Sequence, residues 1–259
     1  MGCFSSPRRP PPRRRVKPFR ACAEYPRSTL LHAVCSFRYK PFPYVQSMVH
    51  HRRLQRARLV NNAGYGTIGA IEEFSMEEIR AQFETNFFGM AALTRAVLPL
   101  LRAQGSGHIV QLSSVSGFRA MAGFGLYNAS KFALEGYSEA LAQEVAPFGI
   151  RVTIVEPGPF RTEFLAGSMK EAETRIEAYR QTPVASMYEY KDRVSGQQEG
   201  DPVKAAHIIC DYVASGNAHL RLPLGKAAIV GLRAKLKSVH DDLEANEELA
   251  KKAVFGEGS

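Results

Sequence analysis

The sequence predicts an α/β fold in which a largely parallel, doubly wound sheet occupies residues 59–225. Three short apolar segments lie at 59–64, 108–112 and 151–155, and each ends in a turn or a loop. The first two are followed by long segments in which apolar residues recur with the 3.6-residue period of an amphipathic helix. Strands that alternate with helices in this way favour parallel pairing, with helices packed against both faces of the sheet.

The head of the chain carries the positive charge and differs in composition from the rest. The 259 residues have a net charge of +9, but residues 1–58 hold 14 of the 34 Lys and Arg residues and one acidic residue. The remaining residues are mildly acidic. We therefore expect three parts: a basic, Pro/Arg-rich and disordered head at 1–58, an α/β domain at 59–225, and a charged helical tail at 226–259.

Several roles are open for the head. Met1-Gly2-Cys3 with Ser6 fits an N-myristoylation pattern, and an arginine-rich, acid-poor start is also typical of a mitochondrial transit peptide or a nucleic-acid-binding arm. The triple proline at 10–12 argues against the amphipathic helix of a transit peptide. The interpretation we favour is that the head has no evolved role and reflects a frameshift or a wrong start.

Capping residues and periodicity predict the remaining elements. Ser75 and Glu78 form the capping-box pattern that begins a helix, and apolar spacing carries this helix to Arg102. Asp201 caps a further helix that runs through Val213. The other predicted elements are a helix that contains Tyr127 and ends at 145, a short helical stretch near 170–180 within a loose segment, an edge strand at 220–223, and a solvated helix at 226–252.

Tyr127 and Lys131 form the first candidate site. On a helix they lie one turn apart on the same face, where an ammonium group lowers the pKa of a phenol by up to about three units before desolvation opposes it. This spacing by itself is weak evidence for a site, because roughly 0.4 Tyr–Lys pairs with the same spacing are expected by chance in a chain of this composition. Its setting strengthens it: Ser114 follows the strand at 108–112, at the carboxyl end where open α/β sheets place their chemistry.

Four motifs, in order, resemble those of the short-chain dehydrogenases/reductases. They are Asn61-Asn62-Ala63-Gly64, Asn86, Ser114 with Tyr127-x-x-x-Lys131, and Pro157-Gly158 followed by Thr162. The resemblance extends from about residue 59 to residue 214, and the segments NNAGYG, TNFFG and VEPGPFRTEF resemble the 17β-hydroxysteroid dehydrogenase-like subgroup. It implies a Rossmann-like sheet that binds NAD or NADP, and reversible hydride transfer between the nicotinamide and an alcohol or ketone.

The resemblance also implies a role for each site residue. Tyr127 is expected to be the acid–base, Lys131 to lower its pKa and bind ribose, Ser114 to polarise the carbonyl, and Asn86 to complete a proton relay. The residues expected to border the cofactor are Asn61, Ala63, Gly64, Tyr127, Lys131, Pro157, Gly158 and Thr162. The sequence has no Cys/His spacing typical of a metal site, so we expect no metal ligands.

The chain departs from this family at the glycine-rich turn that holds the pyrophosphate. Only Gly2 precedes Gly64, so this turn is missing or replaced, and the N-terminal strands of the sheet are expected to be incomplete. Residues 64–69 satisfy G-x-G-x-x-G, but no strand with a terminal acidic residue follows at the required distance, so we reject them as the phosphate loop. The alternative function is therefore a truncated or frameshifted, non-catalytic remnant that cannot bind the dinucleotide. The choice between NAD and NADP stays open.

Residues 160–200 correspond to the mobile substrate lid of the family. Phe160, Phe164, Leu165, Met169, Met187 and Tyr188 either line an apolar pocket there or simply pack together. We expect a small apolar alcohol or ketone as the substrate, a cytoplasmic location, and neither nucleic acid nor a membrane as a partner. Formation of a homo-oligomer is left open.

Overall fold

The computed structural model describes residues 57–217 and 219–255. The predictions of disorder, lipidation and targeting for the head lie outside these residues. In chain order, the elements are β1 (Arg58–Asn61), β2 (Gly66–Ile68), η1 (Ile71–Glu73), α2 (Met76–Phe83), η2 (Glu84–Phe88), α3 (Gly89–Gln104), β3 (Gly107–Leu112), η3 (Val115–Gly117), α4 (Gly125–Val145), η4 (Ala146–Phe148), β4 (Ile150–Pro157), α5 (Phe164–Gly167), β5 (Met169–Glu171), η5 (Glu177–Gln181), α6 (Pro183–Val194), α7 (Pro202–Ala214), β6 (Arg221–Leu224) and α8 (Lys226–Ala250).

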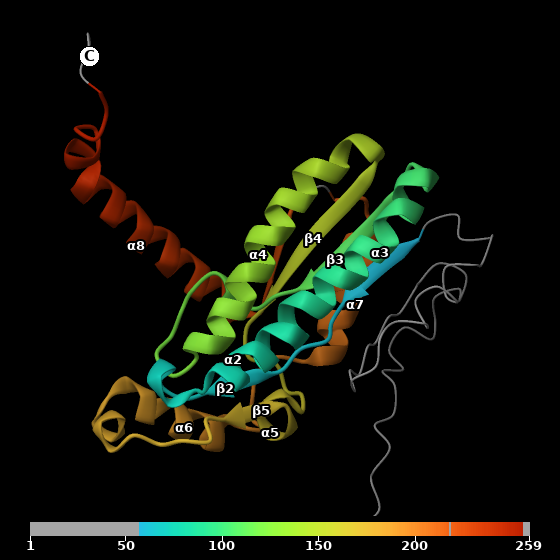
Figure 1. Cartoon of the computed structure of the whole chain (residues 1–259). Helices are drawn as coiled ribbons and strands as arrows, with labels where there is room; N and C mark the ends of the chain where they lie inside the picture. Colours follow the sequence, from blue (N-terminus) through green and yellow to red (C-terminus); the bar gives the residue numbers. More distant parts are fainter. Residues whose placement is uncertain (1–56, 218, 256–259) are drawn as a thin grey trace, which may run out of the picture.

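Within the described residues, the main sheet has four strands in the order β1-β3-β4-β6 (Figure 1). Every neighbouring pair is parallel. Leu59 of β1 is in register with Ile109 of β3, which is in turn in register with Val152 of β4. The carboxyl ends of all four strands therefore lie along one edge of the sheet, which we call the carboxyl edge. In this part of the chain β1 is an edge strand, and any strand that precedes it would fall among residues that are not described.

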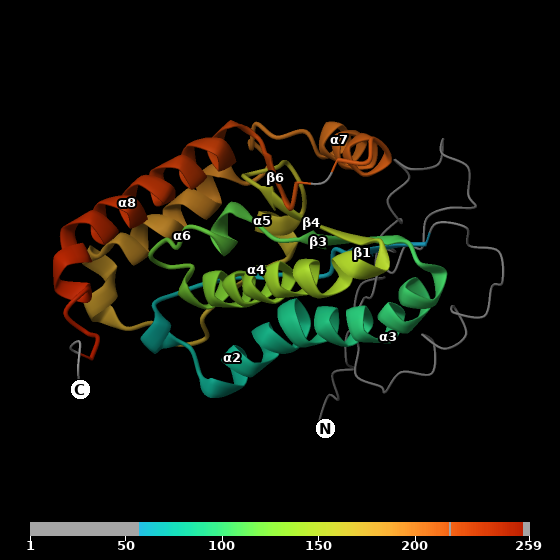
Figure 2. The same cartoon turned by 90° about the horizontal axis from the view of Figure 1, so that it is seen from above.

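Helices cover both faces of the sheet, with α3 and α4 on one side and α7 on the other (Figure 2). Ile109 packs in the cluster that includes residues of α3 and α4, whereas the next residue, Val110, packs in the cluster that includes α7. Successive residues of a strand point to opposite faces, so β3 contributes to both layers. The prediction of a Rossmann-like, doubly wound parallel sheet is confirmed.

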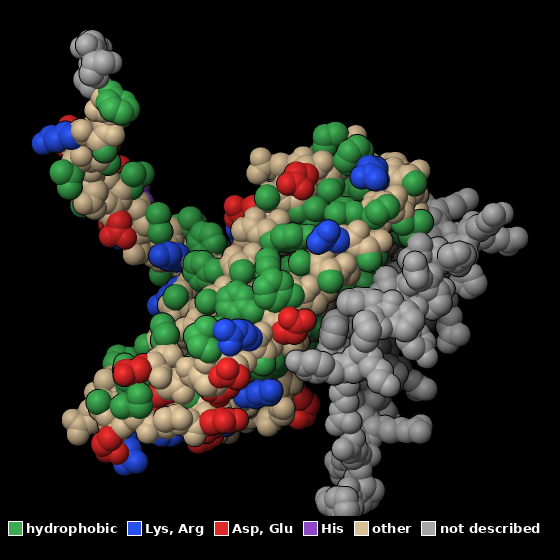
Figure 3. Space-filling view, in the orientation of Figure 1, with side chains coloured by type: hydrophobic (Ala, Val, Ile, Leu, Met, Phe, Trp, Pro, Cys, Tyr) green, Lys and Arg blue, Asp and Glu red, His purple; other side chains and the backbone are tan. Residues whose placement is uncertain are grey.

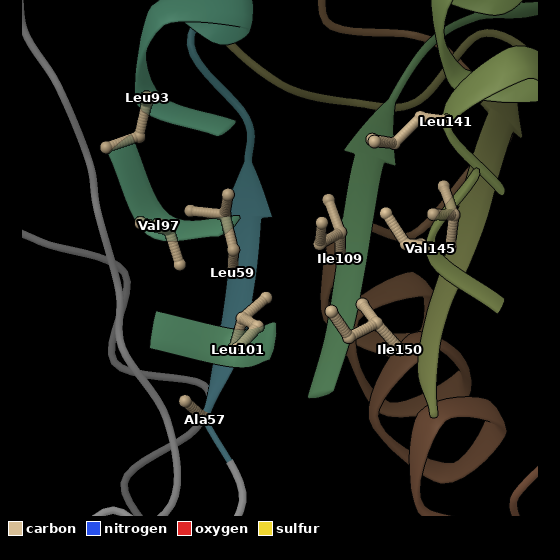
Figure 4. Packing of buried hydrophobic residues seen from close by; sticks show 10 residues of the cluster. Ala57, Leu59, Leu93, Val97, Leu101, Ile109, Leu141, Val145 and Ile150 are labelled. Carbon is tan, nitrogen blue, oxygen red and sulfur yellow. The ribbon is translucent and has the colours of Figure 1, made fainter. Parts of the chain in front are cut away.

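The larger core lies between the sheet and the pair α3 and α4 (Figure 4). Leu59 and Ile109 extend from neighbouring strands, and both are completely buried. Leu101 of α3 and Leu141 of α4 are among the side chains that cover them. Burial of one such side chain stabilises the fold by about 1.5–3 kcal/mol, so this layer anchors the helix that carries Tyr127 and Lys131.

The helix that was predicted from Ser75 to Arg102 is interrupted. Its start is as expected, because the Ser75 side chain accepts a hydrogen bond from the Glu78 N–H and the Glu78 carboxylate accepts one from the Ser75 N–H. After α2, however, five residues adopt a π-helical turn before α3 continues. Asn86 lies inside this turn and is 1% exposed.

The segment at 160–200 is more regular than the sequence predicted. The expected helical stretch near 170–180 is wrong: this part contains strand β5 and the short 3-10 helix η5, and the longer helix, α6, begins at Pro183. Thr182 caps α6 by accepting a hydrogen bond from the Val184 N–H. Strand β5 pairs in parallel with β2, so the glycine motif at 64–69 is extended backbone over Gly66–Ile68 rather than a phosphate loop.

The C-terminal part returns to the sheet and then leaves it. Asp201 caps α7 through hydrogen bonds from two backbone N–H groups, as predicted, and β6 forms the far edge of the sheet. Helix α8 starts against the body and then extends away from it into solvent (Figures 1 and 3). In the described part of the chain, no helix is long and apolar enough to span a membrane.

Candidate active site

The candidate catalytic residues meet at the carboxyl edge of the sheet. Ser114 lies two residues after the end of β3, and Tyr127 and Lys131 occupy the first turns of α4. Asn86 reaches the same place from the π-helical turn η2, where its amide bonds Tyr65 and Ser130 of α4. The structure therefore brings together all four side chains that the sequence motif predicted, although they come from two separate helices, η2 and α4, and from the loop after β3.

Lys131 is 5% exposed, and its position is fixed by the backbone of β3. Its Nζ donates a hydrogen bond of 2.6 Å to the carbonyl oxygen of Leu112, the last residue of that strand. Burial lowers the pKa of Lys131 to about 8, and the carboxylate of Glu135, one turn further along α4, opposes this shift. The ammonium group is thus protonated in most molecules at neutral pH, but it loses its proton more readily than a surface lysine.

Tyr127 is also 5% exposed, and its pKa differs from the expectation. Burial raises the pKa of Tyr127 to about 12, while a hydrogen bond with the Ser114 side chain opposes the rise. The Lys131 Nζ lies 6.0 Å from the centre of the phenol ring. The lowering expected from Lys131 is therefore not observed, because desolvation dominates, and the phenol is neutral near pH 7.

Asn86 uses its whole amide in hydrogen bonds. Its Nδ2 donates to the Tyr65 carbonyl at 2.9 Å and to the Ser130 Oγ at 3.0 Å, and its Oδ1 accepts from the Tyr65 N–H at 3.1 Å. A Cβ added to Gly64 would lie 3.3 Å from this Oδ1 and 3.6 Å from the Lys131 Nζ. Gly64 therefore occupies the narrow space between Asn86 and Lys131, where a side chain would crowd both.

The residues expected to border the cofactor fall into two groups. Asn61 is 7% exposed and its Nδ2 donates to Gln111 Oε1 and Thr94 Oγ1, so its amide joins β1 to β3 and α3 rather than facing outward. The others lie in the loops that follow the strands: Ala63 and Gly64 after β1, and Pro157, Gly158 and Thr162 at or after the end of β4. The Gly158 N–H donates to Leu224 O, which places this turn beside the end of β6.

An apolar cluster adjoins Tyr127 and comes largely from the 160–200 segment. Five of the six residues proposed as a pocket wall pack in it: Phe164, Leu165, Met169, Met187 and Tyr188. The Phe164 ring centre lies 5.5 Å from that of Tyr127. Phe160 differs, because it packs with Val155, Val213 and Leu224 in the cluster on the α7 face of the sheet. Five of the six residues therefore pack together beside Tyr127, whereas Phe160 packs on the α7 face of the sheet.

A buried ion network behind Lys131 was missed by the sequence reasoning. The Arg221 guanidinium bonds the carboxylates of Glu135, Glu156 and Glu139, and it also stacks over the Phe118 ring at 5.0 Å. Glu135 and Glu156 are 4% and 0% exposed. Burial raises the pKa of Glu156 to about 7, with a further contribution from the charge of Glu135, while Arg221 opposes the rise. The only local sign of this network in the sequence was Glu156, an acidic residue that directly follows the apolar segment at 151–155.

Among the residues that the structure describes, no group of three or more His, Cys, Asp or Glu side chains is arranged to hold a metal ion. The acidic residues of the ion network are instead engaged by Arg221.

Comparison with known proteins gives a consistent result. A family model described as "short chain dehydrogenase" matches residues 47–173. The chain is 39% identical over 186 residues to oxidoreductase BOA17 of Botryotinia fuckeliana, covering 71% of this chain and 67% of that protein. It is 40% identical over 184 residues to 3-ketodihydrosphingosine reductase of Bacteroides thetaiotaomicron, covering 70% of this chain and 66% of that protein. The chain thus spans about two thirds of the length of these curated relatives.

A solved structure supports the same relationship. The crystal structure of a short-chain dehydrogenase from Streptomyces avermitilis superimposes with a TM-score of 0.73 and 40% sequence identity. The match covers 81% of this chain and 76% of that one. Both the fold and the sequence therefore agree over most of the described residues.

Proposed function

Because this chain belongs to the short-chain dehydrogenase family, we propose that it is an NAD- or NADP-dependent oxidoreductase that interconverts an alcohol and a ketone by hydride transfer. The observation that carries the proposal is the burial of Tyr127 and Lys131 side by side on α4, with the Ser114 hydroxyl bonded to the phenol. Two neighbouring titratable groups in a nearly water-free setting are costly unless they serve chemistry.

The described residues fit the nicotinamide and ribose end of such a cofactor. Lys131 and Tyr127 supply a hydrogen-bonding ammonium and phenol at the carboxyl edge, where doubly wound sheets bind dinucleotides. Gly64 leaves the loop after β1 without a side chain beside them. The described residues offer no glycine-rich turn for the pyrophosphate, so that end would have to rest on other residues of the chain.

The residues of the site would donate or accept the proton, while the bound nicotinamide would supply or accept the hydride. In the direction of reduction, Tyr127 would donate its hydroxyl proton to the oxygen of the ketone, for which its neutral form is the required state. Ser114 would hold the same oxygen by a hydrogen bond. The positive charge of Lys131 would stabilise the phenolate that results, and oxidation of the alcohol would use these groups in reverse.

The substrate would be apolar. Phe164, Leu165 and Met169 bring an apolar surface to within ring contact of Tyr127. A relative that is 40% identical is named 3-ketodihydrosphingosine reductase. A ketone or secondary alcohol with a bulky apolar body would suit this wall, and a hydroxysteroid-like substrate is one member of that class.

Tyr127→Phe tests the proposal directly. We expect turnover of apolar ketones with NADH or NADPH to fall by at least about 100-fold, because the proton donor is lost, while cofactor affinity changes little. The matched control is Tyr137→Phe, which removes a hydroxyl from the same helix where the ring instead packs edge-on against Phe87. Retained turnover in Tyr127→Phe would refute the assignment. Failure of the parent chain to bind either cofactor in a fluorescence titration would favour the non-catalytic alternative.

A further inference from the structure

Helix α8 carries an apolar stripe that the described part of the chain does not cover. The stripe follows alternating steps of three and four residues through Ile229, Leu232, Leu236, Val239 and Leu243, and the same steps continue to the polar Asn246 and to Ala250. This is the seven-residue repeat with which two helices pack along a shared seam. Leu236, Val239 and Leu243 are 56%, 48% and 61% exposed, although side chains of this kind are usually buried.

The helix contacts the body only through its first turns. Ala228 and Gly231 are buried, and a Cβ added to Gly231 would lie 2.9 Å from the Val115 side chain. From Leu236 to Ala250, every described residue is exposed. A free helix of this length is only marginally stable in water, and apolar residues repeated along one side add a further reason for a partner.

The charges of α8 identify the partner. Residues 226–238 contain four basic and no acidic side chains, whereas residues 239–250 contain five acidic and no Lys or Arg side chains. A second α8 that runs in the opposite direction would place its acidic half beside this basic half, and the reverse at the other end. A parallel pair would place like charges together, which costs free energy.

We propose that α8 is a self-association surface on which two copies of this chain pair through antiparallel α8 helices. Lys235 and Asp242 are seven residues apart and flank the stripe on the same side. In an antiparallel pair with two-fold symmetry, this flank faces its own counterpart, so Lys235 meets Asp242 of the second copy twice. In a parallel pair, the flank with Lys235 and Asp242 would instead face the opposite flank of the second helix, and Asp242 would meet Glu247 of the second copy.

Two neighbouring ion pairs are already satisfied within the helix. Lys237 Nζ lies 2.7 Å from Asp241 Oδ2, and Lys251 Nζ lies 2.8 Å from Glu247 Oε1. Among the described residues, no ion pair is formed by Lys235 or Asp242, so both charges are free to act between copies.

Charge reversal separates the possible arrangements. We measure association of the full chain by sedimentation velocity over a series of concentrations at low and high salt. We expect a dimer that weakens with salt, and about tenfold weaker association for either Lys235→Glu or Asp242→Lys. The combined variant Lys235→Glu/Asp242→Lys should recover the affinity of the parent chain, because it recreates opposite charges between copies.

Alanine substitutions test the stripe itself. Leu243→Ala should weaken association by at least about tenfold while favouring the helix, since alanine is the best helix former. Val230→Ala is the matched control: Val230 is 65% exposed on the same helix but lies away from the stripe. The proposal is overturned if the chain is monomeric throughout or if association is unchanged by all these substitutions because it uses another face. It is also overturned if Asp242→Lys tightens association, as a parallel pair with Asp242 beside Glu247 would require.

Discussion

Replacing Glu156 by Gln probes the buried ion network that lies behind the candidate site. Glu156 is completely buried in β4, and burial, together with the charge of Glu135, raises its pKa to about 7. In the unfolded chain its pKa would be near the ordinary value of about 4.3. A carboxyl whose pKa is raised by folding contributes stability below its unfolded pKa, and that contribution is lost as pH rises through the folded pKa.

The expected magnitude follows from these two pKa values. Between about pH 5 and about pH 8, ionisation of Glu156 should lower the free energy of unfolding of the parent chain by about 2.5 kcal/mol. Glu156→Gln cannot ionise, so the free energy of unfolding of the variant relative to the parent should rise by about this amount over the same range. The sign holds even if the loss of the bond to Arg221 makes the variant less stable at every pH.

Urea unfolding of both proteins at several pH values measures this difference. Glu139→Gln is the matched control, because Glu139 also bonds Arg221 but is 50% exposed in its side chain. We expect its effect to be small and nearly independent of pH, as for most exposed ion pairs. A difference between Glu156→Gln and the parent that stays constant from acid to alkaline pH would show that folding does not raise the pKa of Glu156, and the reasoning would be wrong.

Two further predictions concern buried polar side chains. Asn61→Ala should lower the free energy of unfolding by about 2 kcal/mol, because it leaves the buried Gln111 and Thr94 oxygens without a donor. Asn62→Ala, at the exposed neighbouring residue, is the control and should have almost no effect. Equal losses of stability for the two variants in chemical denaturation would contradict this prediction. Burial lowers the pKa of His108 to about 4, so the free energy of unfolding of the parent should fall by about 2 kcal/mol as pH falls from about 7 to about 5. His108→Gln keeps a partner for Thr153 Oγ1 but cannot take up this proton, so its free energy of unfolding should fall by about 2 kcal/mol less than that of the parent over the same pH range.

The strands and the first turns of the main helices were predictable because their signals are local. The Ser75 and Glu78 capping box needs only three residues of sequence, and the alternation of Ile109 and Val110 between two packed faces is typical of a strand inside a parallel sheet. Ser114, Tyr127 and Lys131 could also be placed, since a strand end and a helix start fix their positions before any long-range contact is known.

The features that the sequence did not predict depend on residues that are far apart. Arg221 bonds Glu135 and Glu156, which lie 86 and 65 residues away in the sequence. The residues next to each of the three give no sign of the other two. The pKa of Tyr127 depends on how completely α4 and the 160–200 segment exclude water, which no spacing reveals. Helix α6 was missed because its polar exposed face hides its period, and only the Thr182 cap and Pro183 marked its start.

The π-helical turn at Glu84–Phe88 has a consequence for the length of the chain. A π turn holds one residue more than an α turn, and each residue rotates a helix by about 100°. The extra residue thus sets the phase of α3 relative to α2, so that Leu93, Val97 and Leu101 face the sheet while Asn86 turns toward Lys131. Replacing side chains within this turn does not change the number of residues in it, and so does not change the rotation of α3 relative to α2. Here the number of residues is under tighter constraint than the identity of most of them, and a homologous helix one residue shorter would have to present a different face to its sheet.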